Sequence, residues 1–523
     1  MADTDAAVPA DEGMIMLHPG LPLEWMQAAA LAMGALALWS LIAPLPAGAA
    51  RTGKLGFASV GGRVLHAVLG HRAPLLALRV ASAALFVLVV VAGFFGSDIP
   101  ERNAATVLVW NLWWPLVVLA VLFAGTAWCA ICPWDALAGW LVRRRLWRRV
   151  VPPPGLHRRV PRALRNVWLA LALFLLLTWL EIGFGVTARP AVTAALALVL
   201  LVLATAFLLL YERKAFCRYA CPVGRTLGCY SRLAAVAVRP VTQAVCDGCR
   251  TLECFNGSRE IEPCPTHLTV GRFSENTFCL SCGNCVQSCP HGNVTWRLRS
   301  PAAEARELAR PPADVAWFML ALLGVTGFHG LTMLPQWGEW TADVVQVLGG
   351  GGQRLAIFTL GMAVAVALPA ALYAAAVALT RLTGAHAVPY RELFARYAFV
   401  ALPLAFAYHL AHNFGHLARE SVELGALFAN PLGRGLAPRT MAEVHERMAD
   451  PLLPDAALFS LQAALLVGGC WLALYVLRHQ AVVTGGGLRG EMRGWRLWPL
   501  AGFALAASAC SLWLMGQDME MRF

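Results

Sequence analysis

The stretch CLSCGNCVQSCP, which runs from Cys279 to Pro290, carries the strongest structural signal in the sequence. Its spacing is that of a bacterial ferredoxin, in which three close cysteines hold one [4Fe–4S] cluster and the fourth, followed by proline, reaches a second cluster. A second cluster needs three more cysteines upstream, and Cys246, Cys249 and Cys254 supply them. The sequence therefore predicts a small domain that holds two clusters.

The exchange of the fourth ligand between the two groups predicts which cysteines hold which cluster. Cys264 also precedes a proline, so it serves as the remote ligand of the upstream group. We expect cluster one to be held by Cys264, Cys279, Cys282 and Cys285, and cluster two by Cys246, Cys249, Cys254 and Cys289. The alternative is a structural zinc site, which usually shows two well-separated Cys-x-x-Cys pairs and fits these eight cysteines less well.

Ten apolar stretches surround the cysteine-rich segment, each near the ~20 residues with which an α-helix crosses a membrane. They lie at approximately 24–45, 74–96, 105–127, 167–187, 190–210, 314–334, 355–379, 394–415, 456–477 and 498–516. The predicted fold is an all-α polytopic membrane protein of about ten transmembrane helices with an inserted small 2[4Fe–4S] ferredoxin-like domain. We expect an N-terminal membrane domain of five spans (1–210), the ferredoxin-like domain (211–313) and a C-terminal membrane domain of five spans (314–523).

The composition of the 523 residues agrees with this fold, because 59% are hydrophobic and only 14% are charged, against about a quarter in soluble proteins. A water-soluble enzyme is therefore disfavoured. The net charge of +12 does not indicate a nucleic-acid partner, since the arginines lie beside apolar runs. Every second loop is basic, above all the loop with Arg143, Arg158, Arg159, Arg162 and Arg165. This pattern predicts a bacterial inner-membrane protein in contact with lipid, with a cytoplasmic ferredoxin-like domain and both termini in the periplasm.

Two further cysteine pairs close apolar spans, and each pair ends in Cys-Pro. Cys129 and Cys132 follow the third span, and Cys217 and Cys221 follow the fifth. Both spans run inward, so both pairs are expected at the cytoplasmic face, where four thiolates could hold a metal or redox centre or form reactive dithiols. The alternative is that these are small apolar side chains that pack at helix ends.

With these motifs in view, the chain resembles the NapH/NosR/CcoG-like membrane polyferredoxins. The resemblance covers roughly 105–300 and rests on the stretch CRYACPVG (217–224) and on the run from Cys279 to Pro290. The first pair differs from the family pattern, which has three residues between the cysteines where this sequence has two. Proteins of that family are accessory to periplasmic nitrate reductase, nitrous oxide reductase and cytochrome oxidase assembly. The resemblance implies electron transfer linked to a quinone pool or to periplasmic metal centres.

Histidines in the second half of the chain indicate a further cofactor near the outer membrane face. His409, His412 and His416 share one face of the eighth predicted span, and His329 lies at similar depth in the sixth. Two facing histidines could ligate a b-type haem, with His329 and His409 preferred and the others as alternates, and three or four could hold another metal. The alternative is that they only hydrogen-bond water at the interface. Glu181, near the outer end of the fourth span, is the candidate catalytic residue, as a proton carrier for quinone chemistry.

The expected function is electron transfer, as an oxidoreductase or an electron-transfer subunit. Electrons would pass between the cytoplasm or the quinone pool and a centre near the outer membrane face, with a redox protein or quinone as partner. Two alternatives stay open. One is a redox sensor or metal-centre assembly factor without steady electron flux, and the other is a quinol dehydrogenase.

Overall fold

The computed structural model describes residues 17–46, 60–143, 154–273, 275–307, 311–347, 354–384, 388–420, 424–440, 442–444, 452–485 and 494–520. Within these residues the chain is mostly helical, and nine helices are long and apolar enough to cross a membrane. They are Leu23–Ile42, Arg72–Phe95, Ala104–Ala124, Pro190–Leu210, Ala313–Leu331, Arg354–Thr383, Tyr390–Arg419, Asp455–Val482 and Gly494–Met515. The chain is therefore a multi-pass membrane protein, and the predicted all-α class is confirmed.

The predicted fourth span, 167–187, differs from the expectation because its helix is short. Helix α8 covers Trp168–Gly183, which is 16 residues, against the ~20 of a full membrane span. Gly185 then adopts a left-handed conformation with φ of 57°, and a short turn leads to Pro190, the first residue of α9 (Pro190–Leu210). The ten predicted spans thus appear, in the described residues, as nine long helices and one short apolar helix.

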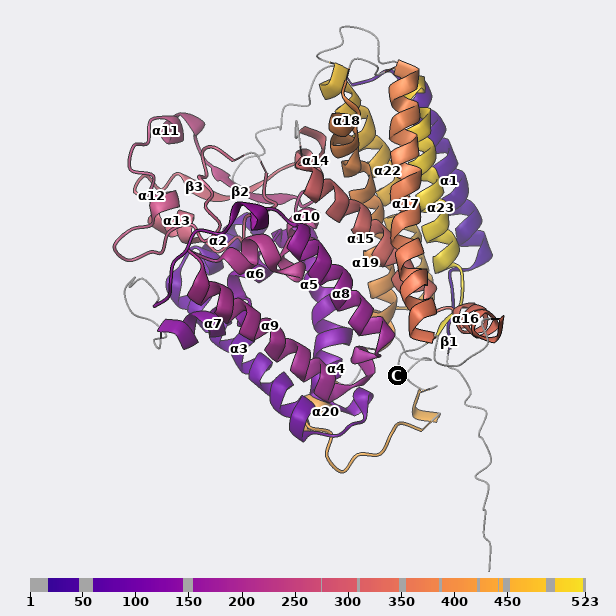
Figure 1. Ribbon diagram of the computed structural model, residues 1–523, viewed down its shortest axis with the longest axis horizontal. Helices are drawn as coiled ribbons and strands as arrows, with labels where there is room; N and C mark the ends of the chain where they lie inside the picture. Colours follow the sequence, from indigo (N-terminus) through magenta and orange to yellow (C-terminus); the bar gives the residue numbers. More distant parts are fainter. Residues whose placement is uncertain are drawn as a thin grey trace, which may run out of the picture.

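The helices form two groups (Figure 1). The first contains α3 (Arg72–Phe95), the continuous stretch of α4 (Ala104–Thr106), a π-helical turn (Val107–Trp113) and α5 (Trp114–Ala124), then α7 (Pro133–Arg143), α8 and α9. The second contains α1 (Leu23–Ile42), α15 (Ala313–Leu331), α17 (Arg354–Gly384), α18 (Tyr390–Tyr397), α19 (Ala401–Glu420), α22 (Asp455–Gly485) and α23 (Trp498–Met515).

The expected N-terminal membrane domain ends at residue 210. Helix α1 precedes that boundary but packs in the second group, against α22 and α23. The reason is local chemistry at its C-terminal end. Arg478 of α22 donates a hydrogen bond of 3.1 Å to the carbonyl of Ala43, and its guanidinium lies 4.7 Å from the ring of Trp39. A cation from α22 therefore satisfies the last carbonyls of α1.

Helix α19 is the centre of the second group. The most apolar window of the stretch Tyr390–Arg419 is buried throughout, between α15 and α22. Gly469 of α22 approaches Ala407 so closely that a Cβ at position 469 would collide with it. Small residues at such a crossing let two helices pack at short range, which fixes the histidines of α19 in place.

Both described ends of the chain lie together, far from the cysteine-rich segment (Figure 1). Strand β1 (Leu17–His18) pairs antiparallel with β4 (Met519–Glu520), and the amide of Gly20 donates to Asp518 at 2.9 Å. The two ends therefore share one face of the helical region, and the cysteine-rich segment lies at the other.

The cysteine-rich segment folds around a two-stranded antiparallel sheet, β2 (Val236–Pro240) and β3 (Val294–Leu298), with Val238 opposite Trp296. Both of these side chains are buried, together with Leu69 at the end of α2 (Val60–Leu69). The short helices nearby are α10 (Pro222–Tyr230), α11 (Gln243–Asp247), α12 (Glu253–Asn256), α13 (Asn284–Ser288) and α14 (Ala303–Glu307). The remaining short helices are α6 (Trp128–Ile131), α16 (Pro335–Val347) and α20 (Leu424–Ala429).

Candidate functional site

Four of the predicted cluster cysteines line one cavity. They are Cys264, Cys279, Cys282 and Cys285. The loop that carries three of them winds around the cavity because Ser281 and Gly283 adopt left-handed backbone conformations, with φ of 48° and 77°. A Cβ at Gly283 would collide with the carbonyl oxygen of Leu69, so α2 closes over this loop. The structure thus brings together the four sulfurs assigned to cluster one.

The other four predicted cysteines line a second cavity. They are Cys246, Cys249, Cys254 and Cys289. Leu252, with φ of 52°, turns the chain between the second and third of these. The division into four and four is the one expected from the exchange of remote ligands, in which Cys264 and Cys289 each serve the cavity of the other group.

Nitrogen donors point at sulfur atoms in both cavities. In the first, the amide of Leu268 donates to Cys264 Sγ at 3.2 Å and that of Ser281 to Cys279 Sγ at 3.4 Å. In the second, Asn293 donates its amide to Cys289 Sγ at 3.4 Å and its side chain to Cys246 Sγ at 3.3 Å. Hydrogen bonds of this kind stabilise negative charge on sulfur and set cluster potentials in iron–sulfur proteins.

The Cys-Pro motifs end helices by a common mechanism. Residues before proline avoid the helical region, and Cys132, Cys221 and Cys289 have ψ of 124°, 113° and 114°. Pro133 and Pro222 then begin α7 and α10, where their missing amide hydrogen costs nothing. The thiol of Cys221 caps α10 and accepts the amide of Gly224 at 3.2 Å.

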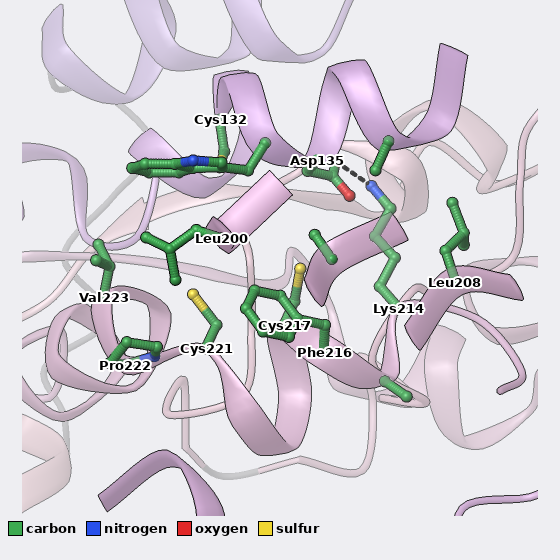
Figure 2. A pocket seen from close by; sticks show the side chains of 14 residues that line it. Cys132, Asp135, Leu200, Leu208, Lys214, Phe216, Cys217, Cys221, Pro222 and Val223 are labelled. Atoms are coloured by element: carbon green, nitrogen blue, oxygen red, sulfur yellow. Dashed lines mark hydrogen bonds and ion pairs between the residues drawn. The ribbon is translucent and has the colours of Figure 1, made fainter. Parts of the chain in front are cut away.

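The two helix-end cysteine pairs meet next to the cysteine-rich segment. Cys132, Cys217 and Cys221 line a third cavity, with Cys132 across from the other two (Figure 2). The same cavity holds a half-buried ion pair of 2.5 Å between Lys214 and Asp135. All fifteen cysteines lie in the described residues, and none forms a disulfide.

Cys129 borders the same group from the side of Arg225, a residue that the sequence did not single out. Arg225 is only 2% exposed, and it interacts electrostatically with Cys129, Cys221 and Cys217. It donates to the carbonyl of Thr277 at 2.7 Å. Burial raises the pKa of Cys129 to about 12, while Arg225 opposes this rise. Without a metal this thiol therefore stays protonated at neutral pH. Arg225 is a buried cation that could compensate the charge of a negatively charged centre at these cysteines.

The three sulfur sites follow one another towards the membrane helices. Cys254 of the second cavity interacts electrostatically with Cys285 of the first, and Cys279 of the first with Cys129. Thr126, at the end of the α4–α5 stretch, donates to the carbonyl of Cys279 at 2.7 Å and so fixes the first cavity to the membrane helices. Among the described residues, no three His, Cys, Asp or Glu side chains converge closely enough to share a single metal ion.

The predicted histidines fall into two places. His329 packs edge-on against His412, with ring centroids 5.2 Å apart, and Nε2 of His412 lies 3.2 Å from Nε2 of His416. Glu181 of α8 lies 4.0 Å from Nδ1 of His329. A further histidine, His18 of β1, contacts His416 with ring centroids 5.7 Å apart. Sequence reasoning missed His18 because β1 reaches this group only through its pairing with the other end of the chain.

His409 points elsewhere, so the structure does not bring it to His329. Its Nδ1 lies 3.1 Å from the hydroxyl of Tyr230, the last residue of α10, and its ring centroid lies 5.6 Å from that of Trp114. Trp114 in turn contacts Trp113 at 5.7 Å, and Trp113 contacts Trp128, the neighbour of Cys129, at 5.4 Å. A series of aromatic rings therefore links the helix-end cysteines to His409.

No protein-family model and no solved structure matches the chain. Among curated proteins, the chain is similar to "Putative electron transport protein YccM" of Escherichia coli (strain K12), with 28% identity over 143 residues. The match covers 27% of this chain and 36% of that protein, so the chain spans little more than a third of the length of the relative it matches.

Proposed function

We propose that this chain is a membrane-bound iron–sulfur electron-transfer protein. The observation that carries the proposal is the grouping of eight cysteines around two neighbouring cavities, four to each, with nitrogen donors aimed at sulfur in both. Cluster one would be held by Cys264, Cys279, Cys282 and Cys285, and cluster two by Cys246, Cys249, Cys254 and Cys289. When bound, such clusters supply one-electron redox chemistry. The name of the similar protein YccM refers to electron transport, which supports the same role.

The helix-end cysteines Cys129, Cys132, Cys217 and Cys221 extend this proposal to a third thiolate centre. Arg225 supports it, because its hydrogen bond to Thr277 leaves Nε and Nη2 buried without a partner in the described residues. A negatively charged centre beside this cation would compensate the remaining desolvation cost. We assign the chain to the bacterial inner membrane, with the cysteine-rich segment in the cytoplasm and both termini outside. The arginines that flank this segment support that orientation, since basic residues favour the cytoplasmic side.

At the opposite face, the group of His18, His329, His412, His416 and Glu181 is the candidate exit for electrons. A b-type haem held by His329 and His412, or a quinone that exchanges protons with Glu181, are the two forms that such a site could take. The contact between His329 and His412 favours this pair over His329 with His409. Pyridine haemochrome analysis of the purified protein separates the two forms, since only the first gives a b-haem spectrum.

The test of the main proposal is spectroscopy on protein purified without oxygen. We expect at least eight iron and eight acid-labile sulfide atoms per chain, and EPR signals of two interacting [4Fe–4S]⁺ clusters after reduction. Protein that binds only zinc at these cysteines would contradict the proposal. A redox sensor or assembly factor would oxidise once and stoichiometrically, whereas an electron-transfer protein passes electrons repeatedly to an added acceptor. A quinol dehydrogenase would do so only with quinol as the donor.

A further inference from the structure

A more open cavity lies beside the first cluster cavity and takes no part in the site described above. Its volume is about 720 Å³, within the range of small-molecule sites. Four arginines line this cavity: Arg159, Arg165, Arg213 and Arg218. Among the described residues that line it, the acidic one is Glu212. The sequence suggested only a topological role for the first two of these arginines, which belong to the basic loop after the third span.

The arginines meet because the basic loop is pinned along the end of α9. The amide of Leu156 donates to the carbonyl of Leu209 at 2.7 Å, and the amide of Glu212 donates to the carbonyl of Arg158 at 3.0 Å. These bonds hold the loop against the chain that follows α9. Two exposed arginines of the loop therefore stand opposite two half-buried arginines, which places like charges around one hollow.

The two half-buried arginines are held in place by the backbone of the cysteine-rich segment. Arg213 has a left-handed backbone with φ of 52°, donates to the carbonyl of Cys264 at 2.8 Å, and stacks 4.4 Å from the ring of Phe255. Arg218 donates to the carbonyl of Thr266, and its Nε is buried without a hydrogen-bond partner in the described residues. A strained backbone and an unsatisfied buried donor are features that proteins retain mainly at functional sites.

Four guanidinium groups around one hollow repel one another unless an anion lies between them. Glu212 does not neutralise the positive charge of the arginines, because a single carboxylate faces four guanidinium groups. One oxygen of that carboxylate also lies 4.0 Å from His267, which is a further partner for it. The planar donor fork of arginine matches the oxygens of phosphate. We propose that this cavity binds the phosphate group of a ligand, held by these arginines. The phosphate can come from an anionic lipid headgroup or from a soluble phosphate compound, since the cavity lies where α9 ends.

The experiment uses the full chain in nanodiscs of phosphatidylcholine, titrated with inorganic pyrophosphate by calorimetry. Parallel samples in nanodiscs with phosphatidylglycerol test the lipid source, because that lipid should compete with pyrophosphate and remain bound in native mass spectrometry. The double variant Arg159→Gln/Arg165→Gln removes two exposed charges of the cavity. The matched control, Arg158→Gln/Arg162→Gln, removes two exposed arginines of the same loop that do not line it. Arg218→Lys keeps the charge but loses the donor fork.

We expect the cavity variant to bind the probe at least tenfold more weakly and the control to change by less than twofold, with Arg218→Lys in between. Pyrophosphate binding with no competition from phosphatidylglycerol identifies a soluble ligand, and competition identifies the lipid. The proposal is overturned if neither probe binds the unaltered protein, or if the control loses as much as the cavity variant. Iron content, measured in the same samples, tests the electron-transfer proposal separately, because these loop arginines touch no predicted cluster ligand.

Discussion

Replacing Arg225 by glutamine tests whether the helix-end cysteines hold a redox centre. The side chain is 2% exposed, and its charge interacts with Cys129, Cys221 and Cys217. Reduction adds negative charge to a thiolate-bound cluster, so a neighbouring cation stabilises the reduced form. Two unit charges about 4–6 Å apart interact by about 3–4 kcal/mol at an effective dielectric constant of ~20. For a one-electron couple this corresponds to about 120–170 mV. We therefore expect the reduction potential of this centre to fall by on the order of 100 mV or more.

An EPR-monitored redox titration measures this shift, and the Cys221→Ser variant identifies the signal that belongs to the centre. The matched control is Arg306→Gln, which removes an arginine that is 4% exposed and lies against Tyr475, away from every predicted ligand. The control should move the potential by less than about 30 mV. A signal that keeps its potential in Arg225→Gln, or moves equally in the control, would refute the assignment of Arg225 to a charged centre.

Three further changes test other parts of the structure. The variants Cys282→Ser and Cys249→Ser should each lose about four iron atoms and keep the EPR signal of the other cluster, because the two cavities share no cysteine. The control Cys510→Ser, which changes an exposed cysteine of α23, should keep all iron. Gly283→Ala should lower the free energy of unfolding by at least 1–3 kcal/mol in thermal denaturation, since a Cβ there meets the carbonyl of Leu69 at a left-handed φ. Gly34→Ala, which meets open space, should be nearly neutral, and equal effects would contradict this account of Gly283. If a b-haem is present, His412→Phe should abolish its absorbance and His409→Phe should retain it, and the reverse would restore the pair expected from sequence.

The cysteine sites could be grouped from the sequence because their geometry is local. Three cysteines within seven residues can reach only one small volume, and a following proline forces the extended backbone that Cys221 and Cys289 both show. The apolar spans were equally readable, because their length is set by the membrane. These features depend on neighbours along the chain, which the sequence states directly.

Features that depend on how helices pack sideways could not be read in this way. Apolar periodicity puts His409, His412 and His416 on one broad face of α19, but it does not say which neighbour each meets. Tyr230 captures His409, while His329 meets His412. The packing of α1 against α22 and α23 joins residues that lie hundreds of positions apart in the sequence. The four arginines of the open cavity lie tens of positions apart.

The surroundings of the three cysteine sites differ in exposure, and this difference bears on the proposed electron transfer. Cys249, in the second cavity, lies among exposed residues such as Arg250, whereas every residue of α10, beside the helix-end cysteines, is buried. A sensor needs its reactive sulfurs open to the oxidant, whereas the helix-end cysteines lie beside this fully buried helix. If the chain transfers electrons as we propose, a soluble partner is expected to meet the second cavity before the other two sites. Helix α10, nine residues or about 13 Å long, carries Cys221 at its start and Tyr230 at its end, so a single rigid element leads from the helix-end cysteines to His409.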